Sequence, residues 1–266
     1  MQIDPGDEKA PLKSRVKSFW ERRPCGAQDV ASFDEGSLEF FEAIERMRFG
    51  EDDFMFDVVG FDRWSGKKVL EVGCGLGTDL LQFARGGAAV SGVDLTEKGA
   101  TLTRQRLKLY GLSGDIMVAD GERLPFTDNS FDLVYSWGVI HHTPDTAEAA
   151  RELVRVCKPE GRVLVMVYHR WSLVALQAWL VYGLLAGKPY RSAAQVISEH
   201  MESPGTKVFA RHEALSLFNQ LKELQIQTIL TRYDLRLGRR RFLPRWLRKI
   251  MPSHWGWFLV VRGAKA

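Results

Sequence analysis

The feature that most constrains the fold is an alternation of short apolar segments with longer amphipathic ones between residues 66 and 168. The short segments read KKVLEVG, AAVSGVD, DIMVAD, FDLVYSW and GRVLVMVY, and the longer ones include TDLLQFARGG and TEKGATLTRQRLKLYG. Strands that alternate with helices form parallel sheets with helices on both faces. The β-branched segment GRVLVMVY suits a strand that is buried on both faces. We therefore predict an α/β fold with a doubly wound, mostly parallel sheet.

The alternation stops after residue 170 and resumes with a helix in RHEALSLFNQLKEL and strands in QIQTILTRYDL and GWFLVVR. This pattern predicts four parts of one chain. They are a helical N-terminal extension (1–64), a core (65–169), a helical insertion (170–205) and the rest of the same sheet (206–266), with a basic loop at 236–249.

The bulk composition is that of a globular protein. The chain has 266 residues, of which 45% are apolar and 26% charged. Its first residues, MQIDPGDEKAPLK, lack the apolar core of a secretory signal. The three cysteines are not spaced like zinc ligands, and we expect no metal site and a reduced, cytoplasmic protein.

A glycine-rich turn follows the first predicted strand, in VLEVGCGLGTD. Gly73, Gly75 and Gly77 let the backbone approach a ligand, and the start of the next helix attracts an anion. The Gly-x-Gly-x-Gly spacing differs from the Gly-x-Gly-x-x-Gly of dinucleotide sites, which weighs against a nicotinamide oxidoreductase.

Carboxylates end the next two predicted strands. Asp94 is placed to accept from ribose hydroxyls, and Asp120 from an adenine amino group, with Gly121 and Glu122 beside it. Two ordinary alternatives stay open: the aspartates are turn residues, and Glu71 caps the neighbouring helix.

With ADGERLPFTDNSFDLVYSWGVIHH and RELVRVCKPEGRVLV, these motifs resemble the class I S-adenosylmethionine-dependent methyltransferases. The resemblance covers residues 66 to 168 and is to the small-molecule branch, which includes ubiquinone and menaquinone methyltransferases. It implies a seven-stranded Rossmann-like methyltransferase fold with a helical lid and cap. It also implies S-adenosyl-L-methionine as cofactor and S-adenosyl-L-homocysteine as product.

The resemblance assigns cofactor-binding roles to matching positions. The residues concerned are Glu71, Gly73, Cys74, Gly75 and Gly77 at the methionine part, Asp94 and Leu95 at the nucleoside, Asp120, Gly121 and Glu122 at the adenine, and Trp137 and Gly138 near the sulfonium. We expect the Cys74 side chain itself to be packed within the turn and unreactive.

Methyl transfer is an in-line displacement that needs alignment and exclusion of water, and a base helps when the nucleophile carries a proton. His141 and His142 follow the fourth strand, and Tyr168 and His169 end the fifth, so these four are the candidate catalytic residues. The alternative is that they only shape the pocket or cap the following helix. Thr143 is another candidate for that cap. Downstream, His200 and Glu202 either reach the pocket or build a turn.

Two unusual segments follow strands that open onto the expected substrate edge. WSLVALQAWLVYGLLAG (171–187) is short for a membrane span, and we expect a cap helix whose Trp171, Leu176, Trp179 and Leu180 meet the pocket. Burial in a homodimer and shallow membrane contact are the rival interpretations. In the N-terminal extension, SFWERRPCG predicts a lid anchored by Phe19 and Trp20, with simple packing as the alternative.

The second segment, RLGRRRFLPRWLRK (236–249), holds seven basic residues and no acidic one. The net charge of the whole chain is +4, so the remainder is near −3 (+4 minus +7). Nucleic acid, an anionic membrane surface and an acidic substrate are its candidate partners, and a solvated loop is the plain alternative. The neighbouring apolar run favours a membrane or an amphiphile over nucleic acid.

These observations predict an S-adenosylmethionine-dependent methyltransferase that acts on oxygen, nitrogen or carbon of a small hydrophobic or amphiphilic molecule. Peripheral contact with an anionic membrane and a homodimer both stay open. The alternatives are a methyltransferase of RNA or protein and a non-catalytic module that binds the cofactor.

Overall fold

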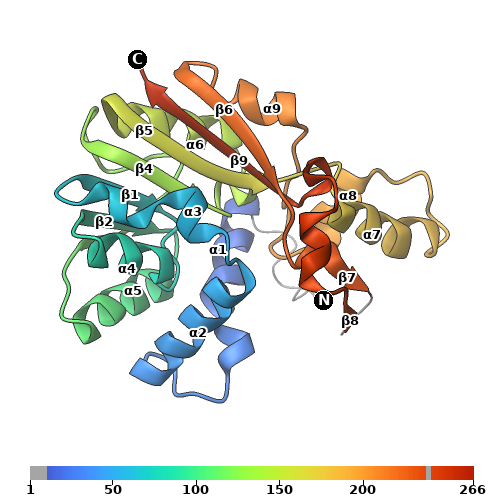
Figure 1. Cartoon of the computed structure of the whole chain (residues 1–266), viewed down its shortest axis with the longest axis horizontal. Helices are drawn as coiled ribbons and strands as arrows, with labels where there is room; N and C mark the ends of the chain where they lie inside the picture. Colours follow the sequence, from blue (N-terminus) through green and yellow to red (C-terminus); the bar gives the residue numbers. More distant parts are fainter. Residues whose placement is uncertain (1–10, 238–240) are drawn as a thin grey trace.

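The computed structural model describes residues 11–237 and 241–266 and contains a seven-stranded sheet (Figure 1). Its strand order is β3-β2-β1-β4-β5-β9-β6. Only β9 runs antiparallel to its neighbours in this sheet, so the prediction of a mostly parallel sheet is confirmed. The strands are β1 (Lys68–Val72), β2 (Ala89–Asp94), β3 (Asp115–Val118), β4 (Phe131–Trp137), β5 (Cys157–Tyr168), β6 (Leu221–Ile229) and β9 (Phe258–Lys265).

Helices cover both faces of the sheet because successive strand residues point to opposite sides. In β5, Leu164 and Met166 pack into one apolar cluster, and Val163 and Val165 into another. The first cluster takes in side chains of α3 (Met55–Val59), α4 (Thr78–Arg85) and α5 (Glu97–Leu109), and the second those of α6 (Thr146–Val156) and α9 (Arg211–Ser216). The doubly wound prediction is thereby confirmed.

The N-terminal extension contributes α1 (Leu12–Arg22), the short turn η2 (Ala27–Val30) and α2 (Leu38–Glu51). A further short turn, η3 (Phe61–Trp64), leads into β1. Phe40 and Phe41 of α2 are buried and pack in a third apolar cluster with Leu76 of the glycine turn and Leu102 of α5. This packing holds the extension against the cofactor half of the sheet.

The apolar run forms α7 (Leu173–Trp179) and the π-helical turn η5 (Leu180–Leu184), and α8 (Ala193–His200) follows. Val174, Ala175 and Ala178 are its buried residues in α7, whereas Trp171 is 68% exposed. Leu176 and Leu180 are also exposed and Trp179 is half-buried, and the prediction that these four residues meet the pocket stays a prediction. Within the described residues, no helix combines the length and hydropathy that crossing a membrane requires.

The basic loop lies beside this insertion (Figure 1) and is partly ordered into short elements. The elements of this region are η6 (Tyr233–Leu235), β7 (Arg236–Leu237), β8 (Arg241–Phe242), η7 (Arg245–Lys249) and η8 (Ser253–Trp255). Residues 238–240 of the predicted loop lie outside the described residues. Arg248 donates to both carboxylate oxygens of Asp53 at 2.9 and 2.8 Å, which ties η7 to the N-terminal extension.

Two predicted boundaries differ from the structure. Helix α9 ends at Ser216, and residues 221–224 already belong to β6. Helix α6 is capped by Asp145, whose side chain accepts from the Glu148 N–H, and not by Thr143. Thr143 instead donates its hydroxyl to the Ile140 carbonyl at 2.7 Å, because it lies too far before the helix to reach its free N–H groups.

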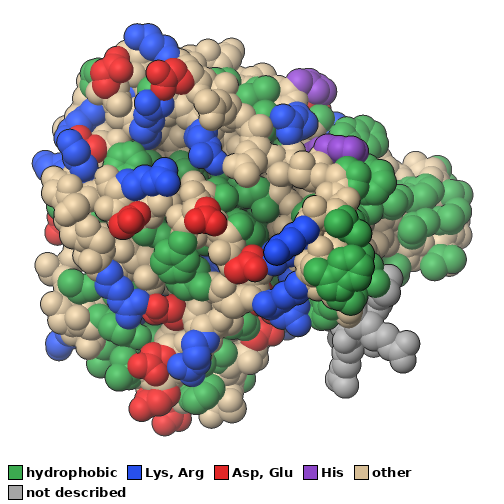
Figure 2. Space-filling model, in the orientation of Figure 1, with side chains coloured by type: hydrophobic (Ala, Val, Ile, Leu, Met, Phe, Trp, Pro, Cys, Tyr) green, Lys and Arg blue, Asp and Glu red, His purple; other side chains and the backbone are tan. Residues whose placement is uncertain are grey.

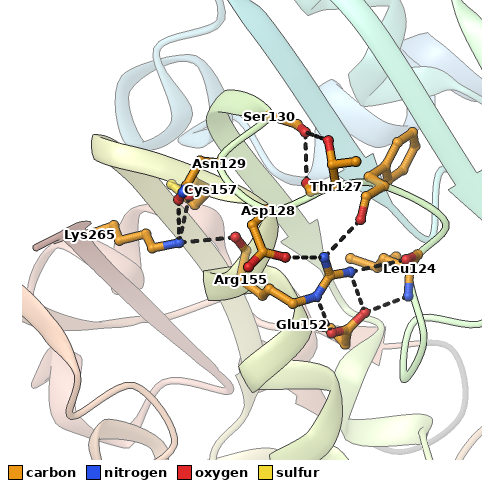
Figure 3. Close-up of polar contacts among 10 residues, drawn as sticks. Leu124, Thr127, Asp128, Asn129, Ser130, Glu152, Arg155, Cys157 and Lys265 are labelled. Atoms are coloured by element: carbon orange, nitrogen blue, oxygen red, sulfur yellow. Dashed lines mark hydrogen bonds and ion pairs between the residues drawn. The ribbon is translucent and has the colours of Figure 1, made fainter.

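A polar network beside α6 fixes the loop that precedes β4 (Figure 3). Arg155 donates to Glu152 and Asp128 and to the carbonyls of Leu124 and Phe126. Lys265 of β9 donates to the Asn129 side chain and to the carbonyls of Arg155 and Cys157. This network holds the ends of three elements together without involving the opposite edge, where the parallel strands end.

Candidate active site

The glycine turn between β1 and α4 closes onto the end of β2. Gly73 has φ +81°, and a Cβ there would lie 2.2 Å from Val139. The N–H groups of Gly73 and Cys74 donate to the Val93 carbonyl, and that of Gly75 donates to Asp94 at 2.9 Å. The Gly77 N–H is likewise used within the turn. These backbone N–H groups are therefore not available to bind an anion. The glycine turn instead allows a ligand to approach the backbone closely.

Glu71 fits both of its expected roles. The N–H of Leu80, in the first turn of α4, hydrogen-bonds its carboxyl group, which is only 4% exposed. Its Oε2 atom is buried and has no partner among the described residues. Burial, with the nearby charges of Asp79 and Asp94, raises the pKa of Glu71 well above its usual range. One oxygen thus faces the first turn of α4, and the other has no partner among the described residues.

Arg48 of α2 reaches the same region, and the sequence motifs did not reveal it. Its guanidinium donates to Asp79 at 3.0 Å and lies 5.8 Å from the Trp137 ring. Asp79 also accepts from the Tyr135 hydroxyl at 2.7 Å. The Trp137 Nε1 is a buried donor with no described partner. This end of the site thus holds an open acceptor, an open donor and a partly buried cation.

Asp94 and Asp120 lie at the ends of neighbouring strands, as expected. Asp94 Oδ1 accepts from the Thr96 N–H at 2.9 Å and hydroxyl at 2.6 Å, which fixes the carboxylate in place. Leu95 is half-buried beside it. Asp120 accepts from the Glu122 N–H at 2.9 Å. Gly121, between these two carboxylates, is half-buried.

Helix α1 crosses these strand ends. Lys13 near its start pairs with Asp120 at 2.5 Å and with Glu122. Glu21 near its end accepts from the first N–H groups of α5, which follows β2. Trp20 packs edge-on against His142, with ring centroids 5.3 Å apart. The helix therefore touches segments that follow β2, β3 and β4.

His142 and Tyr168 meet at Glu202, beside the turn η4 (Ile140–His142). The Tyr168 hydroxyl donates to the Glu202 carboxylate at 2.9 Å. His142 Nε2 lies 3.2 Å from Glu202 Oε2. With His141, whose ring centroid is 4.0 Å from that of Tyr168, these residues form what we name the histidine cluster: His141, His142, Tyr168 and Glu202.

The hydrogen bonds of His142 indicate which ring nitrogen carries the proton. Nδ1 contacts Ser203 Oγ at 2.8 Å and Thr206 Oγ1 at 3.0 Å. Thr206 donates its own hydroxyl proton to the Ser203 carbonyl and is therefore an acceptor for Nδ1–H, whereas the Ser203 hydroxyl is a donor for an Nδ1 lone pair. Both tautomers of the neutral ring therefore have a partner at Nδ1, and Nε2 faces Glu202 in either case.

His141 is fully buried, and neither of its ring nitrogens has a partner among the described residues. Burial, followed by the neighbouring charges of His142 and Lys207, lowers its pKa well below the usual range. The ring is therefore neutral near pH 7, with one nitrogen available as an acceptor.

His169 does not join the cluster, so the expectation that it contacts the substrate has no support in the geometry. It follows Tyr168 directly, and successive residues of an extended chain point to opposite faces. Its Nδ1 lies 3.0 Å from the Gly256 carbonyl instead. His200 is also elsewhere, stacked on Tyr182 with centroids 4.3 Å apart.

Glu202 reaches the cluster because its backbone adopts a conformation that the sequence does not predict. Its φ is +49°, in the left-handed region that non-glycine residues rarely adopt. Lys207 anchors the same loop by donating to the carbonyls of Thr143 and Pro144 at 2.6 and 2.7 Å. The return from the insertion is therefore fastened to the segment after β4, which brings the carboxylate to the two histidines.

Residues 70–165 match a protein-family model described as a methyltransferase domain. This part of the chain is a class I S-adenosylmethionine-dependent methyltransferase domain. The match contains Glu71, the glycine turn, Asp94, Asp120 and both histidines of the cluster. Tyr168, Glu202, Arg48 and α1 lie outside it.

Curated relatives of the methyltransferase domain include two with named activities. A phthiotriol/phenolphthiotriol dimycocerosates methyltransferase of Mycobacterium ulcerans is 37% identical over 133 residues, covering 49% of this chain and 47% of the relative. The chloroplastic tocopherol O-methyltransferase of Arabidopsis thaliana is 36% identical over 120 residues, covering 42% and 34%. The matched part thus spans less than half of either relative.

Among solved structures, a geranyl diphosphate C-methyltransferase from Streptomyces coelicolor A3(2) is similar over nearly the whole chain. The TM-score is 0.65 at 17% identity, covering 97% of this chain and 99% of that one. That protein was solved with Mg²⁺, geranyl diphosphate and S-adenosyl-L-homocysteine. At this identity the likeness establishes a shared fold and nothing more.

The residues of the methyltransferase domain fit S-adenosylmethionine. Its methionine part carries an ammonium and a sulfonium, and the open Glu71 Oε2 lies in a buried region where the charges of Asp79 and Asp94 are also felt. Its ribose and adenine offer hydroxyl and amino donors, and Asp94 and Asp120 provide acceptors at adjacent strand ends.

Proposed function

We propose that the chain transfers a methyl group from S-adenosylmethionine to an oxygen, nitrogen or carbon atom of a small hydrophobic or amphiphilic molecule. The observation that carries the proposal is the position of the histidine cluster. It lies at the same edge of the sheet as the cofactor carboxylates, directly after the strand that contributes Trp137. When bound, the cofactor supplies a methyl group already activated by the sulfonium.

In this proposal the protein holds the cofactor from four directions. Glu71 accepts from the ammonium, and Arg48 or the Trp137 Nε1 faces the carboxylate of the methionine part. Asp94 accepts from the ribose, with Leu95 against the adenine. Residues 120–122 contact the adenine rim, and the turn at 73–77 and Gly138 leave room for close approach. Helix α1 acts as the lid, since it touches the segments after three of these strands.

The histidine cluster receives the acceptor group. Tyr168 holds the Glu202 carboxylate, which offers a lone pair to a departing proton beside His142 Nε2. His141 supplies a further acceptor. All but Glu202 are buried, which limits access of water to the reacting atoms.

The nature of the acceptor is supported by the exposed face of the insertion. Large apolar side chains on η5 and beyond are open to solvent, with Leu185 80% and Tyr190 81% exposed. Figure 2 shows hydrophobic side chains gathered where α7 projects in Figure 1. The named relatives act on a tocopherol and on phthiotriol compounds, which supports an apolar acceptor here.

We further propose that this face touches an anionic membrane from the cytoplasmic side. Trp246 and Ile250 are 59% and 69% exposed, and the residues directly before each of them, Arg245 and Lys249, are also exposed. Aromatic and basic side chains together suit the headgroup region of such a membrane. The free thiols of Cys25, Cys74 and Cys157 are consistent with a reducing compartment.

The activity test incubates the protein with S-adenosylmethionine carrying a labelled methyl group and a whole-cell extract. We expect label in the organic-solvent fraction, and a loss of most of it in Glu202→Gln but not in Glu199→Gln, an exposed control on α8. Label confined to RNA or to protein would contradict the substrate class. Cofactor binding without label in any fraction would favour a non-catalytic module.

The membrane test is co-sedimentation with vesicles of phosphatidylcholine, with and without phosphatidylglycerol. We expect binding only to the anionic vesicles, and its loss in Arg245→Glu/Lys249→Glu and on deletion of residues 239–248, but not in the exposed control Lys108→Glu on α5. Absence of binding by the intact protein would refute the membrane proposal. A dimer by light scattering that Leu185→Glu dissociates would assign the same face to a second copy.

A further inference from the structure

We propose that His141, His142 and Glu202 bind a divalent transition-metal cation, which holds an oxygen atom of the acceptor. The second half of this inference rests on the proposed function, whereas cation binding itself does not. Two imidazoles and one carboxylate form a donor set that suits first-row metals such as Zn²⁺, Co²⁺ and Fe²⁺ better than Mg²⁺.

The geometry brings three donor atoms into one small space. One nitrogen of each histidine and one oxygen of Glu202 all lie within 4.8 Å of one another. Metal–nitrogen and metal–oxygen bonds of about 2.0–2.2 Å require ligand atoms roughly 3–4 Å apart. His142 Nε2 and Glu202 Oε2, which are 3.2 Å apart, already have this spacing.

The contact between His142 and Glu202 is not completed by a hydrogen bond. His142 Nε2 lies 3.2 Å from Glu202 Oε2, yet this buried nitrogen has no hydrogen-bond partner among the described residues. When Nδ1 carries the ring proton and donates it to Thr206, a divalent cation satisfies the Nε2 lone pair and the carboxylate at once.

His141 provides the independent observation. Its side chain is fully buried, and both ring nitrogens lack a partner among the described residues. Leaving such a group unpaired costs about 1–3 kcal/mol, so buried polar atoms are nearly always bonded. A cation shared with His142 and Glu202 accounts for one of these nitrogens.

The groups behind the three donors are arranged as in metal sites. Metal-bound histidines commonly donate their other N–H to an oxygen, and metal-bound carboxylates are themselves hydrogen-bonded. Here Thr206 accepts from His142 Nδ1–H, and Tyr168 donates to Glu202. With three protein ligands, coordination positions remain for an oxygen atom of the acceptor, which the cation binds without any change of oxidation state.

The experiment titrates the purified full chain, dialysed against a chelator, with CoCl₂ and ZnCl₂. We expect one Co²⁺ per chain, with visible absorption bands of a nitrogen- and oxygen-ligated ion, displaced by Zn²⁺ but not by excess Mg²⁺. His141→Ala, His142→Ala and Glu202→Gln should each weaken binding by at least tenfold. Thr206→Val, behind His142, should weaken it by about tenfold as well.

His200→Ala and His254→Ala, histidines outside the cluster, should bind Co²⁺ like the unaltered protein. Binding of S-adenosyl-L-homocysteine, measured on every variant, reports that the fold is intact. Absence of stoichiometric metal binding, or binding that the three ligand variants leave unchanged, would overturn the metal site. Failure of the unaltered protein to bind S-adenosyl-L-homocysteine would instead contradict the proposed function, and the metal titration would still be informative.

Discussion

The Arg155 network and the histidine cluster are both polar groups next to the same sheet, but they differ in whether their polar atoms have hydrogen-bond partners. Arg155 has acceptors for its guanidinium on Glu152, Asp128 and two carbonyls (Figure 3). Neither ring nitrogen of His141 has a hydrogen-bond partner among the described residues, and the same is true of Glu71 Oε2 and Trp137 Nε1. In one region the protein supplies both partners of each hydrogen bond; in the other it supplies one.

The Arg155 network is completed by the protein itself, since an unpaired buried atom is costly. The open atoms of Glu71 and Trp137 lie in β1 and β4, and His141 follows β4, at the edge where parallel sheets bind ligands. Buried atoms without a described partner also occur away from this edge, among them Trp64 Nε1 and Arg106 Nε. Elsewhere Asp234 is intermediate: its Oδ2 accepts from two N–H groups and a hydroxyl, and its Oδ1 has no described partner.

The largest effect on stability is expected for Arg155→Met. Removing the guanidinium leaves Glu152 Oε1 and the carbonyls of Leu124 and Phe126 without this donor, while Glu152 Oε2 keeps the Leu124 N–H. Unsatisfied acceptors of this kind cost up to about 3 kcal/mol. We expect this drop in the free energy of unfolding in urea, with S-adenosyl-L-homocysteine affinity unchanged within about threefold, because the network is remote from the strand ends. A loss of S-adenosyl-L-homocysteine binding free energy as large as the loss of unfolding free energy would contradict the distinction between the Arg155 network and the cofactor edge.

Asp234→Asn is expected to change the pH dependence of stability. Burial raises the pKa of Asp234 from 3.8 to about 6. The folded state then binds more protons than the unfolded state between these values, so this carboxyl makes the protein less stable as pH rises through that window. The variant should gain up to about 3 kcal/mol relative to the unaltered protein between pH 4 and pH 7. If the free energies of unfolding in urea of the variant and the unaltered protein depend on pH in the same way, the Asp234 carboxyl does not have a raised pKa.

The smallest effect is expected for Glu71→Gln. The amide oxygen keeps the bond to the Leu80 N–H, but an NH₂ group replaces the open oxygen and opposes a ligand ammonium. We expect about tenfold weaker S-adenosyl-L-homocysteine binding by calorimetry, as for one lost charged hydrogen bond. Melting temperature should not fall, since a buried carboxyl is removed. Equal affinity with a lower melting temperature would mean that Glu71 only caps α4.

Local sequence was sufficient for the sheet and the cofactor edge. The glycine turn, Asp94 and Asp120 are adjacent to the strands that position them, so spacing alone predicted their places. Arg48 and Glu202 come from other parts of the chain and reach the site only through tertiary packing and, for Glu202, a left-handed backbone. The sequence did not indicate which face of α7 is buried, because a helix that is apolar all round carries no such pattern.

The central claim is that the carboxylates at the strand ends bind the cofactor, and one calorimetric comparison tests it most directly. S-adenosyl-L-homocysteine is titrated into the unaltered protein, Asp94→Ala, and Asp132→Ala, an aspartate near the start of β4 at the opposite edge of the sheet. We predict that Asp94→Ala weakens binding by about 100-fold, as expected for the loss of two charged hydrogen bonds. Asp132→Ala should bind within about threefold of the unaltered protein. Binding that Asp94→Ala leaves unchanged, in a protein that is still folded, would contradict the site.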